Sequence, residues 1–452
     1  MTPPAASPGR AARPTLRYPW CVVLVLTAIY MLSFVDRQIL AFLVGPIERD
    51  FGVNDTRMGL LQGLAFALFY TFMGLPLGRM VDTSNRRRLV SICVLIWSIF
   101  TAGCAATKSF LTLFLARIGV GVGEAGLGPA AYSLISDYFP KEKMGAAISV
   151  YYMGLFFGSA VASLVGGITL DALARTPLLT IPVLGTIASW RIIFLIVGLP
   201  GLLFALLAYA IREPVRLNLL LAADGRPAKA TFRETFAQIR LRWKSMAGIS
   251  VGMACQALTT YAVTAWAPTY FVRAHGWNLA QTGKVLALVL IVFACSGMYV
   301  GGIVSDRWQK RGIADAPLRT GVISALGMIV FLAPSLVLPQ IDWTLAFFVT
   351  GVFFMAFAMG SMVAALQVIF PNQARGQVGA LFLFVLNLGG LTLGPLLPGY
   401  FNDHLFHDPR MIGPSLALTL EIASVLMLIL LAATRKPYRE DFTREYTRAT
   451  AA

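Results

Sequence analysis

Twelve long apolar stretches constrain the fold of this chain more than any other feature of its sequence. A helix that crosses the hydrocarbon core of a bilayer, about 30 Å thick, needs roughly 20 mainly apolar residues. Twelve stretches meet this requirement, near residues 20–44, 58–80, 89–106, 110–139, 145–170, 190–211, 245–272, 279–305, 318–338, 343–370, 377–401 and 412–433. Of the 452 residues, 57% are hydrophobic and only 13% are charged, which excludes an ordinary soluble protein. The sequence therefore predicts an all-α membrane protein with twelve transmembrane helices.

One loop motif occurs in both halves of the chain. Each copy has a glycine, an aspartate four residues later and basic residues beyond. The residues are Gly78, Asp82, Arg86 and Arg87 in the first copy, and Gly302, Asp306, Arg307 and Arg311 in the second. The two glycines are 224 residues apart, as are the two aspartates, and this separation is close to half of the 452 residues. The repeat indicates a duplicated unit and predicts two pseudo-symmetric six-helix bundles.

The apolar pattern also divides the chain into segments. We expect a disordered tail (1–18), a first bundle (19–211), a linker (212–244), a second bundle (245–434) and a second tail (435–452). In the linker, Thr231 and Glu234 have the spacing of a capping box, and apolar residues follow at helical intervals. This pattern favours an interfacial helix on the membrane surface, and a merely solvated linker is the alternative.

The distribution of basic residues predicts the orientation in the membrane. Of the 37 Lys and Arg residues, 27 lie on the side of the termini, 8 lie on the opposite side and two lie inside spans. Short loops rich in Lys and Arg stay on the cytoplasmic side of a membrane. We therefore expect both termini to be cytoplasmic, in a plasma membrane and specifically a bacterial inner membrane.

Four charged residues lie deep in spans of the first half: Asp36, Arg37, Arg117 and Glu124. Charges at this depth are costly and usually functional. Seven residues separate Arg117 from Glu124, so two helical turns place both on one face, about 10 Å apart. We expect Asp36 and Glu124 to couple transport to protons, and Arg37 and Arg117 to bind substrate. The alternative is a pair of structural salt bridges, Asp36 with Arg37 and Arg117 with Glu124.

The second half has few charges in its spans and is rich in aromatic residues and methionine. Its candidate substrate-binding residues are Tyr261, Trp266, Phe357 and Asn387. A cavity between the halves would then be charged on one wall and apolar on the other, which suits an amphipathic anion. For any single aromatic residue, ordinary packing is the alternative.

The repeated loop resembles the signature loop of the major facilitator superfamily, and this resemblance covers the whole chain. Four motifs narrow it to the spinster branch. They are Asp36-Arg37, Gly59-Leu-Leu-Gln62, Arg117 followed by Gly-Val-Gly123-Glu124, and Arg212-Glu213-Pro214. The resemblance implies alternating access between two bundles. It also implies that the two loops act as a conformational latch, although Thr83 and Asn85 depart from the usual motif.

These observations predict a transporter that moves a small amphipathic anion, such as a lysolipid or sphingolipid-like molecule, together with protons. The alternative within the class is an anion symporter for organic acids or sugar phosphates. From other classes, a non-transporting membrane sensor and a membrane enzyme are the competing hypotheses, and no nucleophile with a base supports an enzyme.

We expect no cofactor, metal or nucleic acid partner. The five cysteines all lie in predicted spans without metal-ligand spacing. The run Gly121-Val-Gly123-Glu-Ala-Gly126 matches a dinucleotide fingerprint but follows no strand, so we reject that interpretation. The expected partners are the small-molecule substrate, protons and the lipid bilayer, and we expect a monomer.

Overall fold

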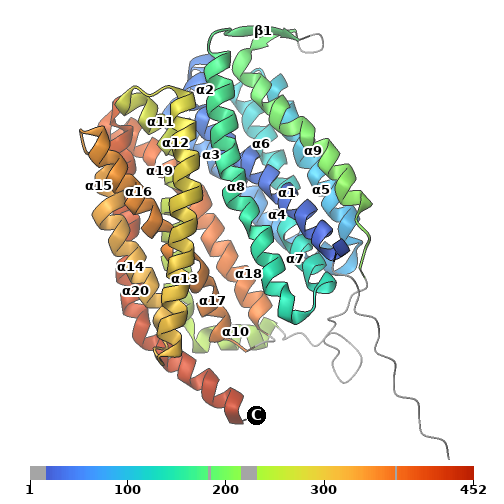
Figure 1. Cartoon of the computed structure of the whole chain (residues 1–452), viewed down its shortest axis with the longest axis vertical. Helices are drawn as coiled ribbons and strands as arrows, with labels where there is room; N and C mark the ends of the chain where they lie inside the picture. Colours follow the sequence, from blue (N-terminus) through green and yellow to red (C-terminus); the bar gives the residue numbers. More distant parts are fainter. Residues whose placement is uncertain (1–16, 182–184, 215–231, 372–373, 452) are drawn as a thin grey trace, which may run out of the picture.

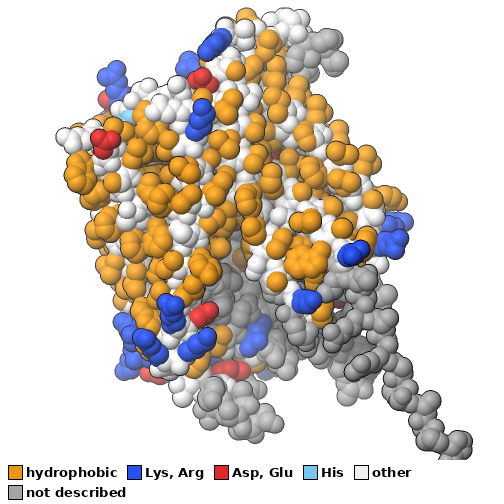
Figure 2. Space-filling view, in the orientation of Figure 1, with side chains coloured by type: hydrophobic (Ala, Val, Ile, Leu, Met, Phe, Trp, Pro, Cys, Tyr) orange, Lys and Arg blue, Asp and Glu red, His pale blue; other side chains and the backbone are white. Residues whose placement is uncertain are grey.

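The computed structural model describes residues 17–181, 185–214, 232–371 and 374–451. In these residues, twelve helices are long and apolar enough to cross a membrane. Each overlaps one of the predicted stretches, so the predicted number and position of the spans are confirmed. Figure 2 shows hydrophobic side chains over the middle of the molecule, with Lys, Arg, Asp and Glu confined to its two ends. This pattern is expected for a protein that lies in a bilayer.

The first half contains the helices of six spans and one β-hairpin, and Figure 1 shows the hairpin at one end of the molecule. Its elements are α1 (Arg17–Ile39), η1 (Leu40–Phe42), α2 (Val44–Phe51), α3 (Asp55–Gln62), α4 (Leu64–Thr83), α5 (Arg86–Gly103), η2 (Cys104–Ala106), α6 (Phe110–Glu124), α7 (Leu127–Tyr138), α8 (Lys141–Leu173), β1 (Leu178–Ile181), β2 (Gly185–Ala188), η3 (Ser189–Arg191) and α9 (Ile192–Ala210).

The second half contains the other six spans, several of which change helical pitch along their length. Its elements are α10 (Phe232–Leu241), α11 (Trp243–His275), α12 (Leu279–Val289), η4 (Leu290–Ala294), α13 (Cys295–Lys310), α14 (Ala316–Gly327), η5 (Met328–Leu332), α15 (Ala333–Ser335), α16 (Ile341–Phe357), α17 (Met359–Val368), α18 (Arg375–Leu386), η6 (Asn387–Leu391), α19 (Thr392–Phe401), η7 (Asn402–Phe406), η8 (Pro409–Met411) and α20 (Ile412–Ala451).

Polar residues between the apolar runs start several of these helices. The side chains of Asn85 and Asn278 accept hydrogen bonds from backbone N–H groups at the starts of α5 and α12. Ser109 forms a capping box with Thr112 at the start of α6. Each cap satisfies N–H groups that the helix itself leaves unpaired. These caps therefore begin the helices close to the residues where hydropathy predicts the spans to begin.

Two local features, a hairpin and a longer last helix, differ from the sequence prediction. The loop between α8 and α9 forms an antiparallel hairpin, in which Leu178 pairs with Ala188, although no strand was predicted. The last helix, α20, runs to Ala451 instead of ending near residue 433. Tyr438 explains part of this extension, because its buried hydroxyl donates to the carbonyl of Ala365. The linker contains α10 where a helix was predicted, while Thr231 lies outside the described residues.

We call the end of the bundle where α1 begins and α20 ends the terminal face, and the other end the far face. Figure 1 shows the C-terminus and α10 at the terminal face, and α2 and the hairpin at the far face. The halves meet closely toward the far face, where α8 packs on α12 and α3 packs on α19. A Cβ atom at Gly283 would lie 2.1 Å from the carbonyl oxygen of Ser163, so only glycine fits this helix crossing.

The repeated loops lie at the terminal face and are not in close contact with the opposite half at their glycines. A Cβ atom at Gly78 or at Gly302 would meet no heavy atom within 4 Å. Asp306 and Arg307 are exposed. The two halves therefore pack tightly toward the far face, while there is open space beside Gly78 and Gly302 at the terminal face.

Candidate functional site

The four charged residues in the first half form two ion pairs between α1 and α6. Arg117 donates from Nη1 to Oδ1 of Asp36 at 2.9 Å. Arg37 donates from Nε to Oε2 of Glu124 at 2.7 Å, and its Nη2 forms an ion pair with the same oxygen at 2.7 Å. The alternative pairing within each helix, Asp36 with Arg37 and Arg117 with Glu124, is wrong. Adjacent residues on a helix point about 100° apart, so each charge of α1 finds its partner on α6 instead.

The pairs are buried and supported by hydroxyl groups. Asp36, Arg117 and Glu124 are each 1% exposed. Thr101 of α5 donates to Asp36, and Ser33 of α1 donates to Glu124. Hydroxyl donors of this kind stabilise an ionised carboxylate. Each carboxylate therefore has one arginine and one hydroxyl partner.

Two buried polar atoms of these pairs have no hydrogen-bond partner among the described residues: Nε of Arg117 and Oε1 of Glu124. Buried polar atoms are nearly always paired, and one that is not often marks a site that binds something else. The pairs therefore retain one donor and one acceptor for a ligand, a proton or water.

Arg37 is also surrounded by aromatic rings. Its guanidinium carbon lies 4.4 Å from the ring centre of Phe66, 4.7 Å from that of Tyr70 and 5.1 Å from that of Phe34. Cation–π contacts of this kind hold an arginine in place when few water molecules surround it. The sequence analysis missed these rings, because helical spacing alone does not reveal which aromatic residues face a charge on another helix.

Two cavities lie between the halves beside these pairs. A cavity of about 40 Å³ is lined by both arginines and, from the second half, by residues that include Tyr261, Leu391 and Pro395. A cavity of about 120 Å³ is lined mainly by apolar residues, including Met355 of the second half. The two share four lining residues, Phe34, Gln38, Tyr261 and Thr264. The charged wall comes from the first half and the methionine-rich wall from the second.

The structure brings only one of the four second-half candidates to these cavities. Tyr261 lines both of them. Trp266 is fully buried, and its indole N–H donates to the carbonyl of Pro395 at 2.7 Å, so it joins α11 to α19. The backbone carbonyl of Phe357 lies against Gly301, and Phe357 is not among the residues that line these two cavities. Asn387 begins η6 and is not among the residues that line these two cavities.

The structure adds polar residues that the sequence analysis did not select. Gln38 follows the Asp36-Arg37 pair, and its amide donates to the carbonyl of Thr264 at 2.7 Å, which links α1 of the first half to α11 of the second. Thr260 and Gln256, about one and two turns of α11 before Thr264, line the larger cavity. Gln256 and Thr260 are far in the sequence from any charged residue, so the sequence alone did not distinguish them from other polar residues in spans.

The arginines of the first repeated loop are held within their own half. Arg86 forms ion pairs with Asp137 at the end of α7 and, at 2.7 Å, with Glu213 after α9. The backbone N–H of Arg87 donates to the same Glu213 at 3.0 Å. Asp82 is in the last turn of α4, at Leu64–Thr83. The contacts of Arg86 and Arg87 join the terminal-face ends of α5, α7 and α9.

The second repeated loop is followed by a cluster that the sequence analysis missed. Asp315, after Arg311, forms ion pairs with Arg319 at 3.3 Å and with Arg435 of α20 at 2.7 Å. Burial raises the pKa of Asp315, but the hydrogen bond from Arg435 and the surrounding arginine charges outweigh burial, so its pKa is below the ordinary value of 3.8. Asp315 therefore stays ionised and ties α14 to α20.

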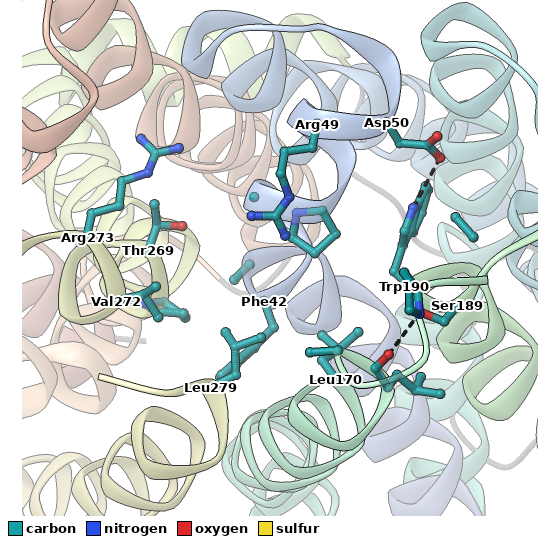
Figure 3. Close-up of a pocket in the computed structure, with 18 residues that line it drawn as sticks. Phe42, Arg49, Asp50, Leu170, Ser189, Trp190, Thr269, Val272, Arg273 and Leu279 are labelled. Atoms are coloured by element: carbon teal, nitrogen blue, oxygen red, sulfur yellow. Dashed lines mark hydrogen bonds between the residues drawn. The ribbon is translucent and has the colours of Figure 1, made fainter. Parts of the chain in front are cut away.

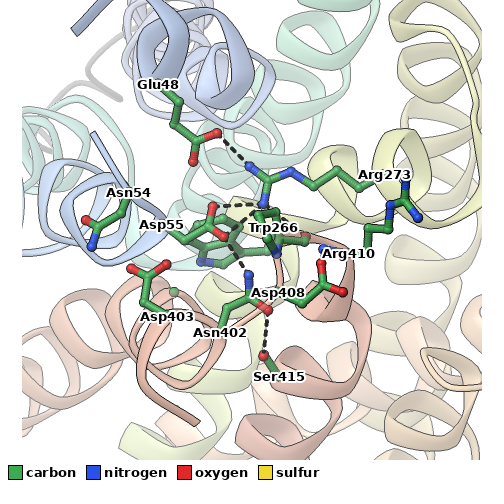
Figure 4. A network of polar contacts seen from close by, with 12 residues as sticks. Glu48, Asn54, Asp55, Trp266, Arg273, Asn402, Asp403, Asp408, Arg410 and Ser415 are labelled. Atoms are coloured by element: carbon green, nitrogen blue, oxygen red, sulfur yellow. Dashed lines mark hydrogen bonds and ion pairs between the residues drawn. The ribbon is translucent and has the colours of Figure 1, made fainter. Parts of the chain in front are cut away.

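A network of polar contacts closes the far face across the two halves (Figure 4). Arg273 of α11 donates to both carboxylate oxygens of Asp55 at 2.9 Å each, and to Glu48 at 2.6 Å. Asn402 also donates to Asp55, at 2.6 Å. We call Glu48, Asp55, Arg273 and Asn402 the far-face lock. Near it, Asp403 accepts the backbone N–H of Thr56 at 2.6 Å.

One carboxyl group of the lock holds a proton unusually well. Burial raises the pKa of Glu48 to about 8, and its hydrogen bond with Asp55 adds to this effect, while Arg273 opposes it. Two carboxyl groups that share one arginine cannot both ionise freely. The sequence analysis missed the lock, because its residues lie at the ends of spans, where charged residues are ordinary.

Comparisons with known proteins agree with this architecture. Residues 26–395 match the Major Facilitator Superfamily. An MFS-type efflux pump of Mycolicibacterium smegmatis is 26% identical over 441 residues, which are 95% of each chain. A probable L-galactonate transporter of Escherichia coli is 26% identical over 392 residues, which are 84% of this chain and 82% of that protein.

One solved structure is similar along nearly the whole chain. It is a bacterial homologue of the human lysosomal transporter Spinster, in an inward-facing and unoccupied conformation. The identity is 26%, the TM-score is 0.78, and the match covers 96% of this chain and 99% of that chain. The resemblance to spinster proteins is confirmed. Because the matching residues make up most of its length, the chain belongs to the Major Facilitator Superfamily of membrane transporters.

Proposed function

We propose that this protein transports a small amphipathic anion together with a proton. The observation that carries the proposal is the arrangement at the central cavities, where two arginine–carboxylate pairs of the first half face an apolar wall of the second. The anionic head group would bind Arg37, which is the more accessible arginine with 13% of its side chain exposed, compared with 1% for Arg117. The apolar part would lie against the second half.

The charges of the site explain why anion transport would be coupled to protons. With both carboxylates ionised, the two pairs have no net charge. An anion that displaces Glu124 from Arg37 leaves a buried carboxylate without its arginine, and such a group is strongly destabilised until it binds a proton. One proton would therefore accompany each anion. Asp36 would hold Arg117 in place and take part in the same exchange.

Alternating access would occur by rocking of the two halves. The closed far-face lock and the open space at Gly78 and Gly302 support an inward-facing conformation. The similarity to an inward-facing solved structure supports it as well. The excess of basic residues supports a cytoplasmic terminal face in a bacterial inner membrane. The repeated loops would close that face when the protein turns outward, as the predicted latch.

The decisive test is uptake of a labelled lysophospholipid into proteoliposomes with and without a pH gradient. We expect the gradient to stimulate uptake by the natural chain. In Glu124→Gln, the gradient should no longer stimulate uptake, because the neutral side chain cannot take up or release the proton. The variant Arg57→Gln, an exposed arginine of α3 away from the site, is the control and should behave like the natural chain. Gradient-driven uptake by Glu124→Gln at the natural rate would refute the coupling.

A second candidate function is transport of sugar acids. The similarity to a probable L-galactonate transporter favours it. Competition between L-galactonate and the lysophospholipid in the same assay separates the two substrates. Counterflow of either substrate would exclude the non-transporting sensor.

A further inference from the structure

A separate pocket of about 390 Å³ lies at the far face, between the two halves. Apolar residues form its interior (Figure 3). They include Phe42, Leu170 and Trp190 of the first half, and Val272 and Leu279 of the second. The pocket shares only Ala41 with the small central cavity and no residue with the larger one.

One positive charge at this pocket is available to a ligand. Arg49 of α2 is exposed, extends over the pocket (Figure 3), and forms no ion pair or hydrogen bond within the described ranges. Asp50 is the one carboxylate among the lining residues, and it is already held by Arg191 at 2.9 Å and by the indole N–H of Trp190 at 3.1 Å. The guanidinium of Arg273 is committed to the far-face lock.

We infer that this pocket binds a single-chain amphiphile with an anionic head group, with the head on Arg49 and the chain on the apolar interior. At roughly 30 Å³ for each non-hydrogen atom, the share of a water molecule in the liquid, 390 Å³ holds about a dozen such atoms. This size fits a medium-chain fatty acid anion, such as decanoate. The site does not use the central charges and is distinct from the transport site.

Occupation of the pocket would hold the protein in one conformation. Its lining comes from both halves, so the ligand makes all of its contacts only while the far face is closed. A ligand that binds one conformation better than another shifts the population toward the first. The amphiphile would therefore keep the far face closed and slow the transport cycle, in proportion to its occupancy.

Trp190 lines the pocket and is one of eight tryptophans in the chain, so the part of the fluorescence quenching that is lost in Trp190→Phe measures binding. Decanoate that is brominated at the end of its chain should quench the fluorescence of Trp190 in proteoliposomes, with saturation. Unlabelled decanoate should compete, while decanol, which has no charge, should not. An ion pair with an exposed arginine strengthens binding by up to roughly fivefold, so Arg49→Gln should shift the saturation curve by about that factor.

Three variants separate this site from its alternatives. Arg57→Gln removes an exposed arginine that does not line the pocket and should leave the curve unchanged. Ala174→Phe should fill part of the pocket and weaken saturable quenching without removing the charge or adding a tryptophan. Glu124→Gln should retain quenching, so the pocket can be tested whether or not the protein transports anions. Equal quenching in Arg49→Gln and Arg57→Gln, or unsaturable quenching by partition into the lipid, would overturn the inference.

Discussion

At the scale of single residues, each charge of α1 is paired with a charge of α6, so both ion pairs are contacts between the two helices. Asp36 and Arg37 are consecutive on one helix, yet each is paired with a different residue of α6. Removal of one partner from a buried pair leaves an uncompensated charge and costs about 3–5 kcal/mol, whereas removal of both costs less. The loss of stability therefore depends on whether a substitution removes one partner of a pair or both partners.

A double-mutant cycle tests this pairing. We expect Asp36→Asn to lower the free energy of unfolding by about 3 kcal/mol, because it leaves Arg117 buried without a countercharge. The double variant with Arg117→Met should regain at least about 1 kcal/mol of the summed loss. Chemical unfolding in lipid bicelles measures these values. The cycle for Arg117 and Glu124, which are not paired, is the control, and a larger coupling energy there would contradict the observed arrangement.

At the scale of elements, the crossing of α8 and α12 holds the far face closed. The helices approach so closely at Gly283 that any side chain would meet the backbone of Ser163. We expect Gly283→Val to separate the two helices and shift the protein toward a conformation with an open far face. Spin labels on the far-face ends of α8 and α12 should report a longer distance in this variant.

The matched control for this crossing is Gly103→Val. A Cβ atom at Gly103, at the end of α5, meets nothing within 4 Å, so the label distance should stay that of the natural chain. An unchanged distance in Gly283→Val would mean that the helices tolerate a side chain by sliding past one another, and that the lock alone keeps the far face closed.

The sequence predicted the elements better than the contacts between them. Hydropathy identifies all twelve spans, because each must satisfy its own backbone in lipid. Depth in a span likewise selected Asp36, Arg37, Arg117 and Glu124, which the structure brings together. The direction of a side chain around its helix depends on packing partners far away in the sequence. For that reason Trp266 lies in a helix contact instead of the cavity.

At the scale of the whole molecule, the far-face lock makes the conformational equilibrium sensitive to pH. In the closed state, burial and the neighbouring Asp55 raise the pKa of Glu48 to about 8. When the far face opens, Glu48 enters water and its pKa returns toward the ordinary value of 4.5. The closed state therefore binds more protons than the open state at intermediate pH. It follows that acidification on the far side favours closure and alkalinity favours opening.

The distance between spin labels across the far face, measured as a function of pH, tests this prediction. Between about pH 5 and 8, the ratio of closed to open molecules should fall by up to tenfold for each unit of rising pH. Glu48→Gln mimics the protonated group, so its distance distribution should be nearly independent of pH in this range. Asp55 and Arg273 face Glu48 directly, and Arg273 pairs with both carboxylates. If Glu48→Gln retained the full pH response, Glu48 would not be the group that makes the far face sensitive to pH.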